Sequence, residues 1–225
     1  MAWLILDPVV ISLVYLFVFT VIRSNPNPTI LFIGISMFNI FSRSVKSGVS
    51  SISDFSGGLK AERVRTRVLT ASMFQYRIID SLLQSVGVSV ILYFGIGISL
   101  FGVLSFIILS TILGILAEGF GLNIAIHAKR TPDLSNIVNY ILLLMFFGSP
   151  ALYSMTITEG LHYRINELNP FTYFVEFARK NAGAESAIDD LFGMEMYCIC
   201  VILSVLAIRG YRTLDRQRWE ISSWS

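Results

Sequence analysis

The sequence predicts an all-α integral membrane protein with six transmembrane helices, a cytoplasmic coupling helix and short re-entrant external gate helices. Of its 225 residues, 54% are hydrophobic and 14% are charged, and the mean hydropathy is +0.69. A helix needs roughly 20 apolar residues to cross a bilayer, because its backbone polar groups must be satisfied within the segment. Several runs reach this length. Since there are no repeats or low-complexity linkers, residues 1–225 are expected to form one domain.

Three spans are expected in the first half of the chain. The first covers about residues 3–22 and ends at SNPNP, whose prolines cannot continue a helix. The second covers about residues 29–56 and stops before Gly57-Gly58. The third covers about residues 72–97. A tight outer turn from Gly97 should follow it.

Three more spans follow, at about residues 103–126, 137–153 and 191–208. Lys and Arg gather in the segments after the second and fourth spans and in the carboxyl-terminal tail. Because cytoplasmic loops carry an excess of these residues, both termini are expected to be cytoplasmic. The chain is therefore predicted to be a multi-pass protein of the cytoplasmic (inner) membrane.

The stretch NPFTYFVEFARK, residues 169–180, is too short and too charged to cross a bilayer. Asn169 is a favourable N-cap and Pro170 suits the first helical position. Glu176 and Lys180 are four residues apart and are expected to pair. One face of this helix should carry Phe171, Phe174 and Ala178. Twelve residues give roughly 18 Å, against a hydrocarbon thickness of about 30 Å, so the helix should lie in the outer interface.

Pro150 lies near the outer end of the fifth predicted span. It is expected to kink that helix and to free backbone groups. Residues 150–190 are therefore predicted to form a re-entrant pair of short helices over the outer mouth.

Catalytic and nucleotide-binding motifs are absent from the sequence. There is no G-x-x-x-x-G-K-[ST], H-E-x-x-H or G-x-S-x-G pattern. The predicted topology puts His127 and His162 on opposite sides of the membrane, so no joint metal site is expected. A net charge of +2 and the lack of a nucleic-acid-binding motif argue against a nucleic-acid partner. The functions that remain for this sequence are transport, sensing or scaffolding.

Charged residues within the predicted spans need partners or water, because an ionisable group at bilayer depth costs several kcal/mol. Arg43 and Lys46 share a face of the second span. They either extend to the cytoplasmic headgroups or line an inner vestibule that attracts a phosphate group. Arg77 and Asp80, three apart in the third span, are expected to pair.

The stretches FFGSPALYSMTI and LNPFTYFVEFAR resemble segments of ABC type-2 transporter permeases that export polysaccharides or lipid-linked glycans such as O-antigen, capsule and teichoic acid. SGGLKAERVRTRVL is similar to the family's coupling loop, and HAKRTPDLSNIVNYILLLMFF to its entry into the fifth span. The resemblance covers nearly the whole chain. The sequence differs in starting almost inside the first span, without the family's usual amphipathic helix, and in having Lys129-Arg130 and Pro132 where R-x-R-D is commoner.

The resemblance implies roles for individual residues. In this family the permease binds a separate ATPase. The resemblance assigns this contact to a coupling helix at about residues 59–67 and to the turn before the fifth span, with Leu59, Lys60, Arg63, Arg65, Arg67 and Arg130. It assigns an external gate to Pro150, Asn169, Pro170, Phe171, Phe174, Glu176 and Arg179. The resemblance assigns the substrate channel to Tyr15, Phe19, Phe146, Tyr153, Arg43 and Lys46. Tyr15 and Phe19 are four residues apart and Phe146 and Tyr153 seven apart, so each pair is expected to share a helix face.

By this resemblance the chain is a permease subunit and not an enzyme. A dimer of permeases, expected to be a homodimer, binds two copies of a cytoplasmic ABC ATPase, which carries ATP and Mg²⁺, so this chain itself needs no cofactor. The substrate implied is a lipid-linked glycan. The alternatives are an ABC type-2 exporter of lipid or drug and a non-transporting membrane subunit of a glycan-synthesis complex.

Overall fold

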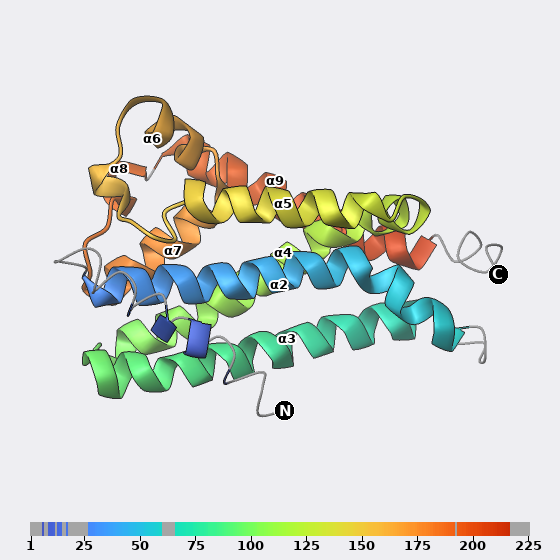
Figure 1. Ribbon diagram of the computed structural model, residues 1–225, viewed down its shortest axis with the longest axis horizontal. Helices are drawn as coiled ribbons and strands as arrows, with labels where there is room; N and C mark the ends of the chain where they lie inside the picture. Colours follow the sequence, from blue (N-terminus) through green and yellow to red (C-terminus); the bar gives the residue numbers. More distant parts are fainter. Residues whose placement is uncertain are drawn as a thin grey trace.

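The computed structural model describes residues 27–59, 66–191 and 193–216, together with residues 6, 9–11, 13, 14 and 17. Over these ranges the protein is helical and contains no strand, in agreement with the predicted class (Figure 1). The long helices are α2 (Pro28–Leu59), α3 (Thr66–Ile91), α4 (Leu100–Arg130), α5 (Asp133–Gly148) and α9 (Met194–Arg216). The short ones are the π-helix η1 (Leu92–Ile96), the 3₁₀ helix η2 (Met155–Ile157), α6 (Gly160–Glu167), α7 (Pro170–Asn181) and α8 (Ile188–Leu191).

Four helices in the described part of the chain are long and apolar enough to cross a membrane. The candidate spans are Pro28–Ser53, Thr70–Ile96, Leu100–Arg130 and Met196–Thr213. They confirm the second, third, fourth and sixth predicted spans within a few residues. Most of the first predicted span lies outside the described residues. The hydrophobic composition of the sequence and these helices together indicate a multi-pass membrane protein.

The helix at the fifth predicted span begins and ends earlier in the chain than expected. α5 covers Asp133–Gly148, 16 residues, against the predicted residues 137–153. At 1.5 Å per residue it is about 24 Å long, which is less than the hydrocarbon thickness. The predicted kink at Pro150 is wrong, because this proline follows the end of the helix.

α2 is the central helix of the bundle. Its span is 72% buried, against 22% for that of α9. Its most extensive contact is with α4, where glycines let the two backbones meet. A Cβ atom added to Gly48 would lie 2.4 Å from the carbonyl oxygen of Glu118, and one added to Gly121 would lie 2.4 Å from that of Val45. A larger residue at either position would separate the helices.

The ends of α2 and α3 differ in detail from the prediction. α2 continues through Gly57 and Gly58 to Leu59 and does not stop at residue 56. Glycine costs about 1 kcal/mol in a helix interior, which does not end a long helix that packs along most of its length. The predicted turn after the third span is present. Gly97 ends η1 with φ of 82°, and the Ser99 side chain caps α4 by accepting from the Gly102 amide at 3.2 Å.

The bundle has two distinct ends (Figure 1). The carboxyl end of α2, the start of α3, the α4–α5 turn and the carboxyl end of α9 lie at one end, and the start of α2, the α3–α4 turn and α6 to α8 lie at the other. The described helix ends that border the predicted cytoplasmic segments therefore share one end of the molecule. Which side of the membrane that end faces stays a prediction.

Candidate functional site

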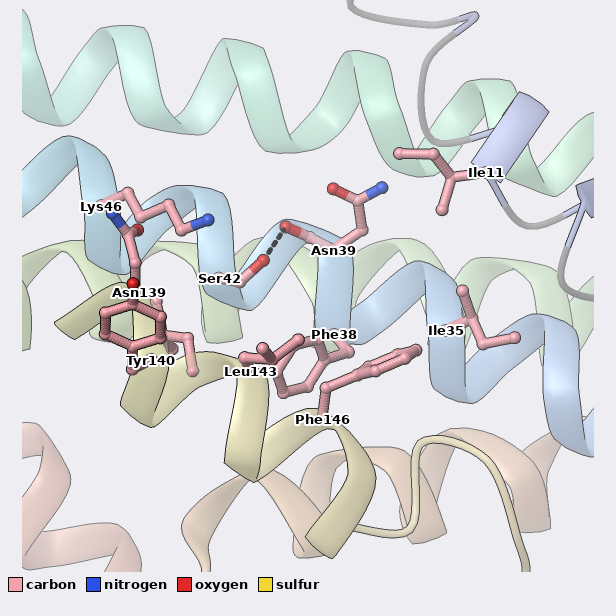
Figure 2. A pocket seen from close by; sticks show the side chains of 11 residues that line it. Ile11, Ile35, Phe38, Asn39, Ser42, Lys46, Asn139, Tyr140, Leu143 and Phe146 are labelled. Carbon is pink, nitrogen blue, oxygen red and sulfur yellow. Dashed lines mark hydrogen bonds between the residues drawn. The ribbon is translucent and has the colours of Figure 1, made fainter. Parts of the chain in front are cut away.

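A groove runs between α2 and α5 (Figure 2). It encloses about 360 Å³. From α2 it is lined by Ile35, Phe38, Asn39, Ser42 and Lys46; from α5 by Asn139, Tyr140, Leu142, Leu143 and Phe146; and from the amino-terminal segment by Ile11. Each helix contributes one side because α2 and α5 contact each other.

The groove combines aromatic rings, amides, a hydroxyl and one cation. The rings of Phe38 and Phe146 lie 5.0 Å apart at 52° and form its floor, since both side chains are buried. Tyr140 is 68% exposed and Lys46 is also exposed, so both are open to a ligand. The Nδ2 atom of Asn39 is buried and has no hydrogen-bond partner among the described residues. Such a lining can bind a polar molecule that carries apolar faces and negative charge.

The structure brings together two of the predicted channel residues. Phe146 and Lys46 both line the groove, from opposite helices. Arg43, one turn before Lys46, is half-buried and does not line it. Tyr15 and Phe19 lie outside the described residues.

Tyr153 does not share a helix face with Phe146, as its spacing suggested, because α5 ends before it. Its hydroxyl donates to the Gly148 carbonyl at 2.6 Å, lies 2.6 Å from Nε2 of His162 and accepts from Nδ2 of Asn166 at 3.0 Å. Burial raises the pKa of Tyr153, while the Asn166 hydrogen bond and the nearby Arg179 charge lower it. Tyr153 therefore fastens the loop after α5 to α6.

α7 begins as the sequence predicts. The side chain of Asn169 accepts from the Phe171 amide at 3.1 Å, and Pro170 occupies the first turn. Phe171 is fully buried and Phe174 is half-buried, so the aromatic face of α7 packs into the protein.

The expected pairing of Glu176 with Lys180 is wrong. Glu176 forms an ion pair of 2.8 Å with Arg179, and Lys180 instead pairs with Asp189. Glu176 and Arg179 lie on the buried side of α7, whereas Lys180 is exposed. A buried carboxylate needs a buried cation, so Glu176 pairs with Arg179 and not with the exposed Lys180. The spacing rule applies to exposed helix positions and does not predict this choice.

Arg179 is the centre of a contact that we call the Arg179 junction, formed with Glu176, Ile30, Pro150 and Tyr153. Besides its ion pair, Nη1 donates to the Tyr153 carbonyl at 3.0 Å, and Nη2 donates to the carbonyls of Ile30 at 2.9 Å and Pro150 at 2.6 Å. Burial lowers the pKa of Arg179, and the neighbouring Glu176 carboxylate opposes that change. The junction joins the start of α2, the loop after α5 and α7.

The other oxygen of Glu176 extends the same junction. Oε2 accepts from the Ala187 amide at 2.8 Å, in the segment before α8. The short helices α6 to α8 are thus held on the end of the bundle by buried polar contacts as well as by packing.

Comparison with known proteins assigns the chain to a family. The family model of ABC-2 type transporters matches residues 1–182, a stretch that includes the groove and the Arg179 junction. The chain belongs to the ABC-2 type transporter family. Among curated proteins, the O-antigen export system permease protein RfbA of Myxococcus xanthus is 32% identical over 163 residues. These residues are 68% of this chain and 60% of that relative, so the match spans about three fifths of the relative's length.

Within this ABC-2 chain a second polar cluster lies between the spans. Arg77 pairs with Asp80 at 2.7 Å, as predicted, and with Glu118 at 3.2 Å. Glu118, for which the sequence suggested no role, also accepts from Ser47 at 3.1 Å and from Tyr211 at 3.0 Å. The cluster joins α2, α3, α4 and α9. Sequence spacing shows only the Arg77–Asp80 pair, because the other contacts cross between helices.

Of the predicted ATPase contacts of this ABC-2 chain, the structure describes Leu59, Arg67 and Arg130. Lys60, Arg63 and Arg65 lie outside the described residues. Leu59 is the last residue of α2 and Arg67 belongs to the first turn of α3, so both ends of the predicted coupling helix lie in long helices. Arg130 is exposed at the end of α4.

In the ranges that the structure describes, no three His, Cys, Asp or Glu side chains lie close enough to hold a metal ion.

Proposed function

We propose that this chain is the transmembrane permease subunit of an ATP-driven exporter that moves a polysaccharide or lipid-linked glycan out across the cytoplasmic membrane. The observation that carries the proposal is the groove between α2 and α5, in which rings, amides and Lys46 line one surface. Family membership and the O-antigen export role in the name of the Myxococcus relative support it.

The chemistry of the groove suits a sugar chain. Pyranose rings have apolar faces that stack on aromatic side chains, and their hydroxyl groups pair with amides and hydroxyls. Loose stacking contacts let a polymer slide, which a tight hydrogen-bond cage would prevent. Lys46 supplies the positive charge that a phosphate or pyrophosphate group of a lipid-linked glycan would meet.

The path itself is proposed to run between two protomers. We count residues 3–22 and α5 as the two further spans, which gives six helices in each subunit with both termini in the cytoplasm. Six helices around one subunit leave little room for a lumen as wide as a glycan. The exposed side chains of Tyr140 and Lys46 leave the groove open for a second copy to complete. In this arrangement α6 and α7 are the external gate.

ATP hydrolysis is assigned to a separate pair of ABC ATPase subunits, because the sequence carries no P-loop motif. The segment around Lys60, Arg63 and Arg65 is their proposed contact. Closure of the ATPase dimer would push on the ends of α2 and α3, tilt the spans and open the gate.

Two other functions compete with this one. A lipid or drug exporter would share the architecture, but its path would favour an apolar lining over the amides and the cation of the groove. A non-transporting membrane subunit of a glycan-synthesis complex would bind no ATPase.

Reconstitution separates the three functions. The chain is purified with the ATPase that it binds and placed in liposomes, and ATP hydrolysis is measured with lipid-linked glycan, with phospholipid or with an amphipathic drug. We expect a stable complex and stimulation by the glycan. Stimulation only by lipid or drug would replace the proposal with the first alternative, and failure to bind any ABC ATPase would favour the second.

A further inference from the structure

A second cavity lies behind α5, on the side away from the groove. It encloses about 460 Å³ between α2, α4, α5 and α9, and every residue that lines it is apolar. Buried side chains of Phe41, Val45 and Leu203 form its floor. We call it the apolar cavity.

The apolar cavity opens to the outside of the bundle along one edge. Four of its lining side chains are exposed by a third or more: Phe120 at 36%, Ile141 at 50%, Ile202 at 57% and Leu168 at 68%. The first three come from α4, α5 and α9, and Leu168 follows α6. α5 packs mainly on α2 and α4 and makes no comparable contact with α9. Because α4 and α9 are candidate spans, we expect this opening to face the hydrocarbon layer.

Neither water nor a helix fits the apolar cavity. Water needs two to four polar partners, and the lining offers none. A helix is about 10 Å wide and is too large for this volume. An empty apolar cavity of this size would be costly, because its lining would lose contacts without replacement. A flexible hydrocarbon chain is the remaining occupant: at ~30 Å³ for a water-sized group, the cavity has room for about 15 of them.

We propose that the apolar cavity binds one acyl chain of a bilayer phospholipid. Phospholipid is the hydrocarbon present at the highest concentration around these spans, so mass action favours it over rarer lipids. The bound chain would support α5 from behind. Leu142 lines both the cavity and the groove, so α5 is the wall between them.

The test uses two tryptophan substitutions on α5. Ile141→Trp places an indole at the mouth of the apolar cavity, whereas Leu144→Trp adds the same ring at a position that is 73% exposed and lines neither cavity. Purified full-length proteins are returned to bilayers of phosphatidylethanolamine and phosphatidylglycerol, and native mass spectrometry then counts the lipids that each chain retains. Ile202→Trp places an indole in the same cavity from α9. It provides a second test if Ile141→Trp fails to fold.

We expect the wild type and Leu144→Trp to retain one phospholipid per chain. Ile141→Trp and Ile202→Trp should show about tenfold lower occupancy, because the ring displaces two or more methylenes at about 0.8 kcal/mol each. Three results would overturn the proposal: no retained lipid in the wild type, equal retention in all variants, or retention of a co-purified isoprenoid lipid instead of phospholipid.

Discussion

Glu176 and Arg179 form an ion pair of 2.8 Å one turn apart on α7, and neither side chain is exposed to solvent. An uncompensated buried charge is far more costly than an exposed one, so each of these residues depends on the other. Nη1 and Nη2 of Arg179 and Oε2 of Glu176 also bind backbone groups of three other segments. The pair thus fixes the position of α7, the proposed gate helix, on the bundle.

Replacing Arg179 with methionine should lower the free energy of unfolding by about 3–5 kcal/mol, because Glu176 and three carbonyls lose their donor. Thermal unfolding of the purified protein in detergent measures the change. Arg164→Met is the matched control on α6, since Arg164 is 76% exposed in its ion pair and should matter by no more than about 0.5 kcal/mol. Similar losses in both variants would refute the importance of the junction.

The contact between α2 and α4 should not tolerate a methyl group at Gly48. Gly48→Ala would place its Cβ 2.4 Å from the Glu118 carbonyl oxygen, so we expect a loss of about 1–3 kcal/mol in unfolding free energy. Gly148→Ala, at the end of α5, meets nothing within 4 Å and should be nearly neutral. Equal stability of the two variants would mean that the helices are not this close.

The two basic residues of α2 should differ in their effect on export. Lys46→Gln removes the cation from the groove and should lower export roughly tenfold, because a charge-assisted contact is worth about 1.5–3 kcal/mol. Arg43→Gln, one turn away, should leave export close to the wild-type rate. Export is measured as glycan on the cell surface and normalised to the amount of permease. The reverse order would remove Lys46 from the proposed path.

Charge reversal at Lys60, Arg63 and Arg65 should uncouple the transporter. If these residues contact the ATPase, the triple glutamate variant should export severalfold less substrate for each ATP hydrolysed, since like charges would then meet at the interface. Transport and hydrolysis are measured together in proteoliposomes. An unchanged ratio would show that the coupling contact lies elsewhere.

The Tyr153 hydroxyl should make stability depend on alkaline pH. Because burial raises its pKa above the ordinary value of 10.0, the folded protein holds this proton more tightly than the unfolded chain. The stabilisation is present in full below about pH 10 and is lost as pH rises through the folded-state pKa. Unfolding temperatures of the wild type and Tyr153→Phe, compared between about pH 9 and 11, should converge at the alkaline end. Parallel curves would contradict this.

The amino-acid sequence alone determined the membrane class, four of the spans and the start of α7. These features depend on local chemistry: apolar length for the spans, and an asparagine followed by proline for the N-cap of α7. The distribution of Lys and Arg also identified the helix ends that lie together at one end of the bundle. The motifs and their order were enough to indicate the family that the comparisons then showed.

Spacing indicated the Arg77–Asp80 pair, but the other contacts of the buried charged residues were decided only by the tertiary structure. Spacing suggested that Glu176 pairs with Lys180 and that Phe146 shares a face with Tyr153, and both expectations failed, because α7 buries the side that carries Arg179 and α5 ends at Gly148. The role of Glu118 and the separation of Lys46 from Arg43 also depend on contacts between helices. A local pattern shows which side chains can be neighbours on one helix, but burial against another helix decides which of them pair.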